Sequence, residues 1–150
     1  MAGCRYACCA TTTRPGSSAQ FERATGGSAE VRTARRSGDE YLLERGLFRR
    51  KTTGVVVQPA YLEFVFPYYW HYDVPRALDY FRRSGADPDP RMGEAVAVVQ
   101  GKRQPGGRWL LDRIHPGRVH FDLEGGTGTR SRWNTLRALR VLRWWDAAAA

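Results

Sequence analysis

The sequence has few cysteines, and none of them lies in the part of the chain expected to form a core. Cys4, Cys8 and Cys9 all fall within the first 10 residues of a chain of 150. A disulfide-stabilised scaffold is therefore excluded for the remainder. Because no fourth ligand lies nearby, we interpret the three cysteines as free thiols on a tail rather than as a closed zinc site.

Long hydrophobic runs are also missing. No stretch is long and apolar enough for a signal peptide or a membrane span, so we expect a cytoplasmic protein. Acidic residues are the minority, because 24 Lys and Arg oppose 15 Asp and Glu and give a formal net charge of +9. This balance permits, without demonstrating, binding to nucleic acid or to another anionic partner.

The length suggests one domain with a modest core. Residues 1–27 are rich in Ala, Thr, Gly, Ser and Arg, show no sustained hydrophobic period and are predicted to be disordered. Residues 28–146 form the predicted helical domain, and residues 147–150 form a tail.

Apolar spacing and capping residues predict four helices. Their predicted spans are residues 28–45, 73–84, 89–102 and 131–145. Asp73 and Asp89 are good N-caps, and each is followed by a proline in the first turn. Ser28 and Ser131 are the other predicted N-caps. A short strand is predicted at residues 55–57, and the overall class is all-α, an array of αα-hairpins with long connections.

The last predicted helix is apolar over most of its circumference. Ala138 and Val141 lie on one face, whereas Arg137, Arg140 and Arg143 lie on the other. We therefore expect this helix to pack on two sides, with its arginine side chains reaching out to the surface.

The aromatic-rich stretch before the second predicted helix contains the first candidate site. His71 and Asp73 lie two residues apart and form a candidate catalytic acid–base pair, or part of a metal site. The alternative, which we favour, is that Asp73 only caps the helix and His71 bonds a neighbouring loop.

A second long loop carries His115, His120 and Asp122. If this loop folds over the first, the three histidines converge near Asp73 and offer ligands suited to zinc or iron, or the groups of a hydrolase. We favour structural hydrogen bonds in the loops instead, and expect no metal and no cofactor.

Aromatic side chains supply the remaining candidates for a ligand pocket. Tyr69, Trp70, Trp109 and Trp133 can line an apolar pocket, in which aromatic faces stabilise cations. The favoured alternative is that Trp109 wedges between helices. The arginines of residues 130–143, interleaved with tryptophan, can also grip single-stranded nucleic acid, although a solvated face is the favoured interpretation.

Four segments, in this order, carry a resemblance to a known family. They are Phe66–Tyr80, Gln100–Trp109, His115–Arg118 and Ser131–Leu142. The second contains a Gly-x-Trp like that of the Gln-x-x-x-Gly-x-Trp repeat. Together they resemble the C-terminal part of bacterial squalene-cyclase-like proteins, in the terpenoid cyclase and protein prenyltransferase superfamily, over about residues 30–146. The resemblance implies an α/α-toroid, with Trp109 wedged between helices.

The chain departs from the family pattern in its chemistry. Arg103 stands at the glutamine position of the repeat, and no Asp-x-Asp-Asp run, the proton donor of class II cyclases, is present. The zinc ligands of prenyltransferases have no clear counterpart. The resemblance therefore implies the fold better than a reaction, and whether the protein is an enzyme stays open.

Four helices are fewer than a full toroid needs. We expect a partial toroid, either from a truncated or wrongly started gene product or completed by self-association or a partner chain. The predicted function is a squalene-cyclase-like protein of unknown activity that binds an apolar, isoprenoid-like small molecule. The alternative is a basic helical module that binds nucleic acid or another anionic partner.

Overall fold

The chain folds into a mostly helical structure, which confirms the all-α class at a coarse level. The computed structural model describes residues 20–117 and 120–148. Its elements are a helix at residues 20–25, α2 (Ala29–Leu43), the 3-10 helix η1 (Pro59–Leu62), α3 (Val74–Ser84), the 3-10 helix η2 (Pro90–Met92), α4 (Gly93–Gly101), β1 (Trp109–Leu110), β2 (Arg130–Ser131) and α5 (Arg132–Ala147).

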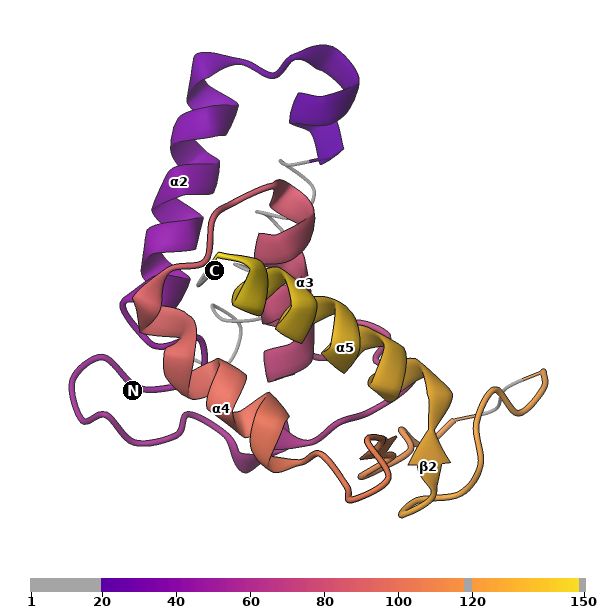
Figure 1. The fold of residues 1–150 in the computed structure, drawn as a ribbon. Coiled ribbons are helices and arrows are strands. Elements are labelled where there is room, and N and C mark those ends of the chain that lie inside the picture. Colours follow the sequence, from indigo (N-terminus) through magenta and orange to yellow (C-terminus); the bar gives the residue numbers. More distant parts are fainter. Residues whose placement is uncertain (1–19, 118–119, 149–150) are drawn as a thin grey trace.

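Helices α3, α4 and α5 pack against one another in pairs and enclose the core. In Figure 1, α2 rises along one side of this group, and the loops that follow α4 lie at the opposite end. Apolar side chains from all three helices are buried at the centre, namely Leu78, Phe81, Val96, Val99, Ala138 and Val141. Removing this surface from water is the main term that stabilises the arrangement.

The predicted caps Asp73, Gly85 and Ser131 are confirmed. The Asp73 carboxylate accepts from the Arg76 N–H at 2.6 Å, and α3 ends at Gly85, whose φ of 78° suits glycine. The Ser131 hydroxyl accepts from the Asn134 N–H at 2.9 Å. Asp89 caps the short turn η2 rather than α4 itself, which begins three residues later than η2.

The strand predicted at residues 55–57 does not form. Val56 makes only an isolated bridge to Arg49, and the regular strand pair is instead β1 with β2, antiparallel, with Trp109 opposite Ser131. Both strands contain two residues, which is too short for an alternating pattern to be visible in the sequence.

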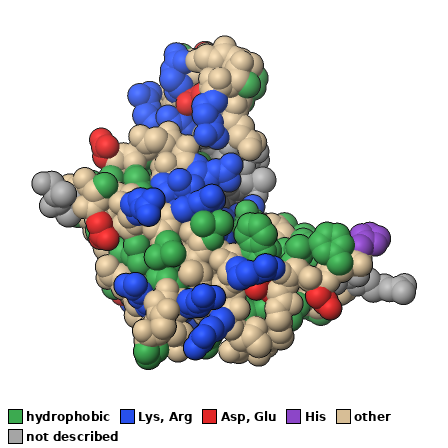
Figure 2. All heavy atoms as spheres, turned by 45° about the vertical axis from the view of Figure 1, so that its right-hand side comes forward, with side chains coloured by type: hydrophobic (Ala, Val, Ile, Leu, Met, Phe, Trp, Pro, Cys, Tyr) green, Lys and Arg blue, Asp and Glu red, His purple; other side chains and the backbone are tan. Residues whose placement is uncertain are grey.

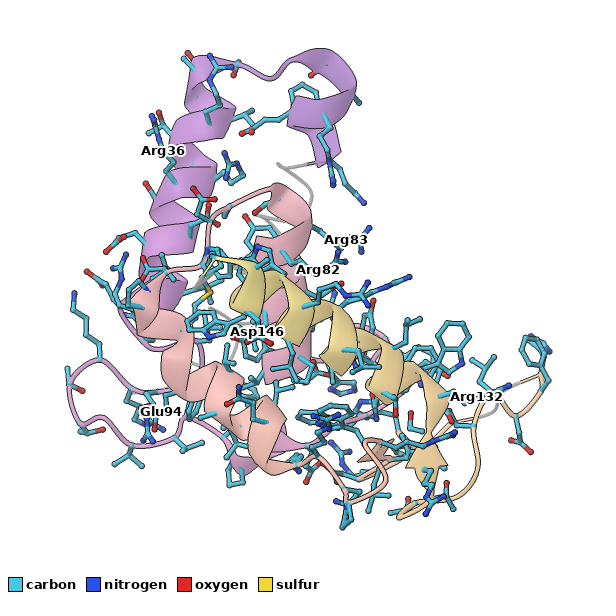
Figure 3. The ribbon with its side chains drawn as sticks, in the orientation of Figure 1. Arg36, Arg82, Arg83, Glu94, Arg132 and Asp146 are labelled. Carbon is cyan, nitrogen blue, oxygen red and sulfur yellow. The ribbon has the colours of Figure 1, made fainter. Side chains whose placement is uncertain are left out.

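Helix α5 packs on one side only within the part of the chain that the structure describes, so the expected two-sided packing is wrong there. Its buried stripe is Asn134, Arg137, Ala138 and Val141. Leu136 and Leu139 are exposed on the other side. Figure 2 shows basic and hydrophobic side chains interspersed on the face that includes the right-hand side of Figure 1. In Figure 3, Arg132 and Asp146 mark the two ends of this helix.

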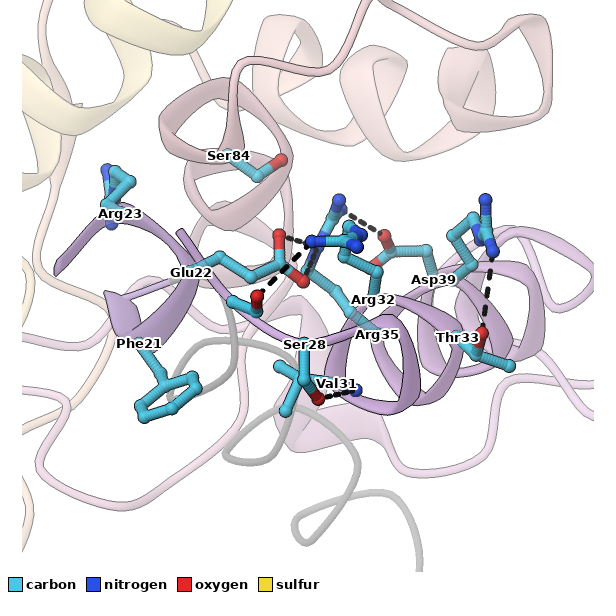
Figure 4. Close-up of polar contacts among 12 residues, drawn as sticks. Phe21, Glu22, Arg23, Ser28, Val31, Arg32, Thr33, Arg35, Asp39 and Ser84 are labelled. Atoms are coloured by element: carbon cyan, nitrogen blue, oxygen red, sulfur yellow. Dashed lines mark hydrogen bonds and ion pairs between the residues drawn. The ribbon is translucent and has the colours of Figure 1, made fainter. Parts of the chain in front are cut away.

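Residues 20–25 form a helix, although they lie in the segment predicted to be disordered. Arg35 of α2 contacts this helix through an ion pair with Glu22 at 3.1 Å, and Asp39 on α2 itself also pairs with Arg35 at 3.0 Å (Figure 4). The Tyr80 hydroxyl donates to Asp39 at 2.6 Å and so joins α2 to α3. The three cysteines lie outside the described residues.

Candidate functional site

The loop of residues 64–73 is held in place by side chains from the inner stripe of α5. The Asn134 side-chain amide donates to the carbonyl oxygens of Phe64 at 3.0 Å and Leu110 at 3.2 Å. The Arg137 guanidinium donates to the Val65 carbonyl at 3.2 Å. Side chains of α5 thus satisfy backbone carbonyl groups of the loop and of β1, so α5 helps to fix the loop conformation.

Asp73 and Arg137 form a buried ion pair at the start of α3, the helix that follows this loop. Arg137 Nη2 lies 2.7 Å from Asp73 Oδ1, and the side chains are 10% and 3% exposed. Burial raises the pKa of Asp73, while the guanidinium of Arg137 and the N–H of Arg76 oppose that change. The expectation that Arg137 reaches the surface is therefore wrong, because its charge is matched inside.

Asp112 holds the loop that follows β1, here called the second loop, against the loop of residues 64–73, here called the first loop. Its backbone N–H donates to the Phe64 carbonyl at 2.9 Å, and its carboxylate accepts from the Phe64 N–H at 2.7 Å and from Lys102 Nζ at 2.5 Å. An isolated parallel bridge also joins Val65 to Arg113. These bonds bring His115 of the second loop close to His71 of the first loop.

His71 and His115 are the two predicted site residues that the structure brings into direct contact. Their rings stack with centroids 3.7 Å apart and planes inclined by 13°. His71 is exposed, whereas His115 is 8% exposed. Burial, together with electrostatic repulsion from His71 and Arg113, lowers the pKa of His115 and so favours its neutral ring.

A cleft, here called the polar cleft, lies between these two loops and contains both histidines and Asp73. Its volume is about 210 Å³. It is lined by Gln58, Ala60, Tyr61, Val65, His71, Tyr72, Asp73, Arg113 and His115. Asp73 Oδ2 and His115 Nε2 are buried and make no hydrogen bond to any described residue. Since buried polar atoms nearly always have a partner, these two atoms are the chemically exceptional feature of the cleft.

A second cleft, here called the apolar cleft, shares His115 with the polar cleft. Its volume is about 180 Å³. It is lined by Phe66, Pro67, Tyr69, Ile114, His115, Gly117, Phe121, Asp122, Leu123 and Glu124. Large apolar side chains that are exposed to solvent gather here, with Phe121 68%, Ile114 46% and Tyr69 43% exposed.

Several predicted pocket residues lie elsewhere. Trp109 is fully buried and donates from Nε1 to the Val99 carbonyl at 2.7 Å, which corrects its assignment to a pocket and agrees with the wedge alternative. Trp133 stacks on Phe66 at 5.2 Å, outside the lining of either cleft. Trp70 is 74% exposed and packs on His71.

His120 is exposed and lines neither cleft, so the alternative in which all three histidines converge does not hold for this residue. Asp73 and His71 both line the polar cleft, and Asp73 there pairs with Arg137 and caps α3, as the favoured alternative for this residue predicted. Among residues 20–117 and 120–148, no three His, Cys, Asp or Glu side chains are grouped to hold a metal ion.

Reasoning from the sequence missed the polar residues that build the site. Arg113 pairs with Glu63 at 2.5 Å and contacts His115, and Arg137 pairs with Asp73. The available signal for Arg137 was its position, because it lies three residues after Asn134 and four before Val141, on the same helical stripe. Treating every arginine as outward-facing concealed that stripe.

Comparisons with protein-family models, with curated proteins and with solved structures gave no match to this chain. In the portion that the structure describes, no helix combines the length and the apolar character needed to span a bilayer. The function must therefore be inferred from the two clefts and from the surface of α5.

Proposed function

We propose that this protein binds a small apolar molecule in the apolar cleft, and that its helical domain is a partial toroid of the squalene-cyclase-like type. The proposal includes the cytoplasmic location expected from the sequence. The observation that carries the binding function is the gathering of exposed Phe121, Ile114 and Tyr69 around one cleft. Exposed apolar patches of this kind typify ligand sites on soluble domains.

The support for the toroid type is the order and packing of the helices. Helices α3 and α4 are consecutive and in contact, and α5 packs on both of them. The outer side of α5, with Leu136 and Leu139 exposed, is the side on which a further helix layer of a toroid would pack. A second copy of this chain, or a partner chain, is the proposed source of that layer.

The size of the cleft selects the probe. A volume of about 180 Å³ is below the roughly 300–1,000 Å³ of pockets for drug-sized ligands. A squalene-length chain is much larger than this volume, whereas a short isoprenoid is closer to it in size. Geraniol, a monoterpene alcohol, is therefore the appropriate first ligand.

The test is geraniol binding, measured by titration calorimetry, with Phe121→Ser as the diagnostic variant. Loss of one large apolar contact, worth about 1.5–3 kcal/mol, should weaken binding roughly tenfold or more. Phe21→Ser makes the same change at a phenylalanine that is 49% exposed and outside the cleft, and should leave the affinity unchanged. Equal affinities for the wild type and Phe121→Ser would contradict the proposal.

A second candidate function rests on the outer face of α5. Arg132, Arg140 and Arg143 are exposed there and make no ion pair with any residue that the structure describes. Trp133 is 39% exposed beside them. Unpaired guanidinium groups next to an aromatic ring are the groups that hold single-stranded nucleic acid.

This second candidate predicts a steep salt response, since phosphate contacts release counterions, whereas binding of geraniol is nearly independent of salt. Fluorescence anisotropy with a single-stranded oligonucleotide at low and moderate salt measures it. Arg140→Glu should weaken the complex, and Arg36→Glu, the same change on exposed Arg36 of α2 (Figure 3), should do so less. Equal effects of the two variants would show that the oligonucleotide responds to the net charge of the protein and not to the α5 face.

A further inference from the structure

We infer that the polar cleft is a separate binding site for the neutral donor–acceptor group of a small organic molecule, such as a primary carboxamide or a hydroxyl. The two buried atoms without partners, Asp73 Oδ2 and His115 Nε2, are the groups that hold it. Nothing in this inference depends on the apolar cleft, with which the polar cleft shares only His115.

The proton on His115 can be placed from its neighbour. Arg113 Nη1 lies 3.5 Å from Nδ1 of His115, and a guanidinium group has donors but no acceptor. The lone pair of the neutral ring must therefore lie on Nδ1, and the proton on Nε2. His115 and Asp73, which both line the polar cleft, thus carry one buried donor, Nε2–H, and one buried acceptor, Oδ2, that have no partner among the described residues.

The charges around the cleft exclude a ligand that is itself charged. The Asp73 carboxylate is already compensated by Arg137 at 2.7 Å, and Arg113 by Glu63 at 2.5 Å. An added cation would face these guanidinium groups with no free countercharge, and an added anion would face the carboxylate. A neutral group that donates to one atom and accepts from the other satisfies both without a new buried charge.

The dimensions and walls of the cleft argue for a molecule larger than water. About 210 Å³ is several times the roughly 30 Å³ that one water occupies in the liquid. Tyr61 and Tyr72 form part of the wall, with their rings packed edge to face at 4.7 Å. A flat ring that carries a carboxamide, as in benzamide, combines an apolar body for these walls with the required polar pair.

The experiment compares benzamide with N,N-dimethylbenzamide, which keeps the carbonyl and lacks the N–H donor. Long-range proton–nitrogen correlation spectra of the wild-type protein first report the tautomer of His115 and then its response to each probe. We expect the Nε2–H form and a saturable shift of the His115 ring signals with benzamide. The dimethyl compound should bind about tenfold more weakly or worse, because it leaves Asp73 Oδ2 unpaired.

A pair of variants tests the assignment to this histidine. His115→Phe should weaken benzamide binding by about tenfold, whereas His120→Phe, the same change at an exposed histidine outside both clefts, should not alter it. Amide spectra of each variant confirm the fold. Equal affinity for the two probes, an Nδ1–H tautomer, no saturable shift, or equal effects of the two variants would each overturn the inference. Phe121→Ser distinguishes the two sites, because it should weaken geraniol binding roughly tenfold or more and leave benzamide binding unchanged.

Discussion

Replacing Arg137 with leucine should destabilise the protein strongly, because it leaves the Asp73 carboxylate buried without its counterion. The carboxylate side chain is 3% exposed and Arg137 contacts it at 2.7 Å. Breaking a buried pair from one side typically costs about 3–5 kcal/mol, compared with a total stability of about 5–15 kcal/mol for a domain. We therefore expect Arg137→Leu to consume a large fraction of the free energy of unfolding.

A double-mutant cycle separates the charge from the other contacts of this arginine. Asp73→Asn keeps an N-cap residue for α3 and removes the negative charge. In that background, Arg137→Leu should cost only what the lost hydrogen bond to the Val65 carbonyl and the lost packing contribute, about 1–3 kcal/mol. The coupling energy between the two residues should then be on the order of 2 kcal/mol.

Urea unfolding followed by tryptophan fluorescence and by circular dichroism measures all four proteins of the cycle. Arg140→Leu is the matched control, since Arg140 lies one turn further along α5, is exposed and makes no ion pair with the described residues. It should change the stability by about 0.5 kcal/mol or less. The reasoning is refuted if Arg137→Leu is as mild as Arg140→Leu, or if Asp73→Asn leaves the cost of Arg137→Leu unchanged.

Three further predictions concern single residues. Burial and neighbouring positive charge lower the pKa of His115 in the folded state, so the unfolded chain takes up this proton at a higher pH than the folded chain does. The contribution of His115 to stability is therefore present above about pH 6.5 and is lost as the pH falls through the lower folded value. Urea unfolding at neutral and mildly acidic pH should show that the free energy of unfolding falls with pH, and His115→Phe should remove this dependence. Trp109→Phe should lower the free energy of unfolding by about 1–3 kcal/mol, because the buried Val99 carbonyl loses its donor. Trp109→Ala should lower it by about 3–5 kcal/mol, because a cavity also forms. A phenylalanine variant as stable as the wild type would show that this hydrogen bond contributes nothing to stability. Gly85→Ala should lower the stability measured in thermal melts by about 1–2 kcal/mol, through its φ of 78° alone, since an added Cβ meets open space there. Gly101→Ala within α4 should be neutral or stabilising, and equal losses of stability in the two variants would refute the backbone argument.

Local signals in the sequence predicted the helices because each signal acts over a few residues. Asp73, Gly85 and Ser131 cap helices through bonds to neighbours within one turn, and the structure contains these bonds. The end of α2 was placed two residues late, because Leu43 is followed by Glu44 and Arg45, which are good helix formers. Such boundaries depend on tertiary packing, which the sequence does not display.

The site was predicted only in part because its geometry depends on contacts between distant segments. His71 and His115 were both recognised as candidates, and their stacking depends on the bonds that Asp112 makes to the first loop. Arg137 was missed because charged residues on a helical wheel were assigned to the solvent-exposed face from their residue type alone. Its buried partner, Asp73, precedes it by 64 residues, and no local pattern reports such a pairing.

The bonds from Asn134 and Arg137 to the loop of residues 64–73 have a consequence for biosynthesis. The loop and α3 leave the ribosome before α5, so during that interval the Asp73 carboxylate lacks Arg137 and the Val65 carbonyl lacks its donor. We expect a nascent chain arrested before α5 to expose its aromatic loop to chaperones and proteases. Emergence of α5 then supplies these bonds to the loop.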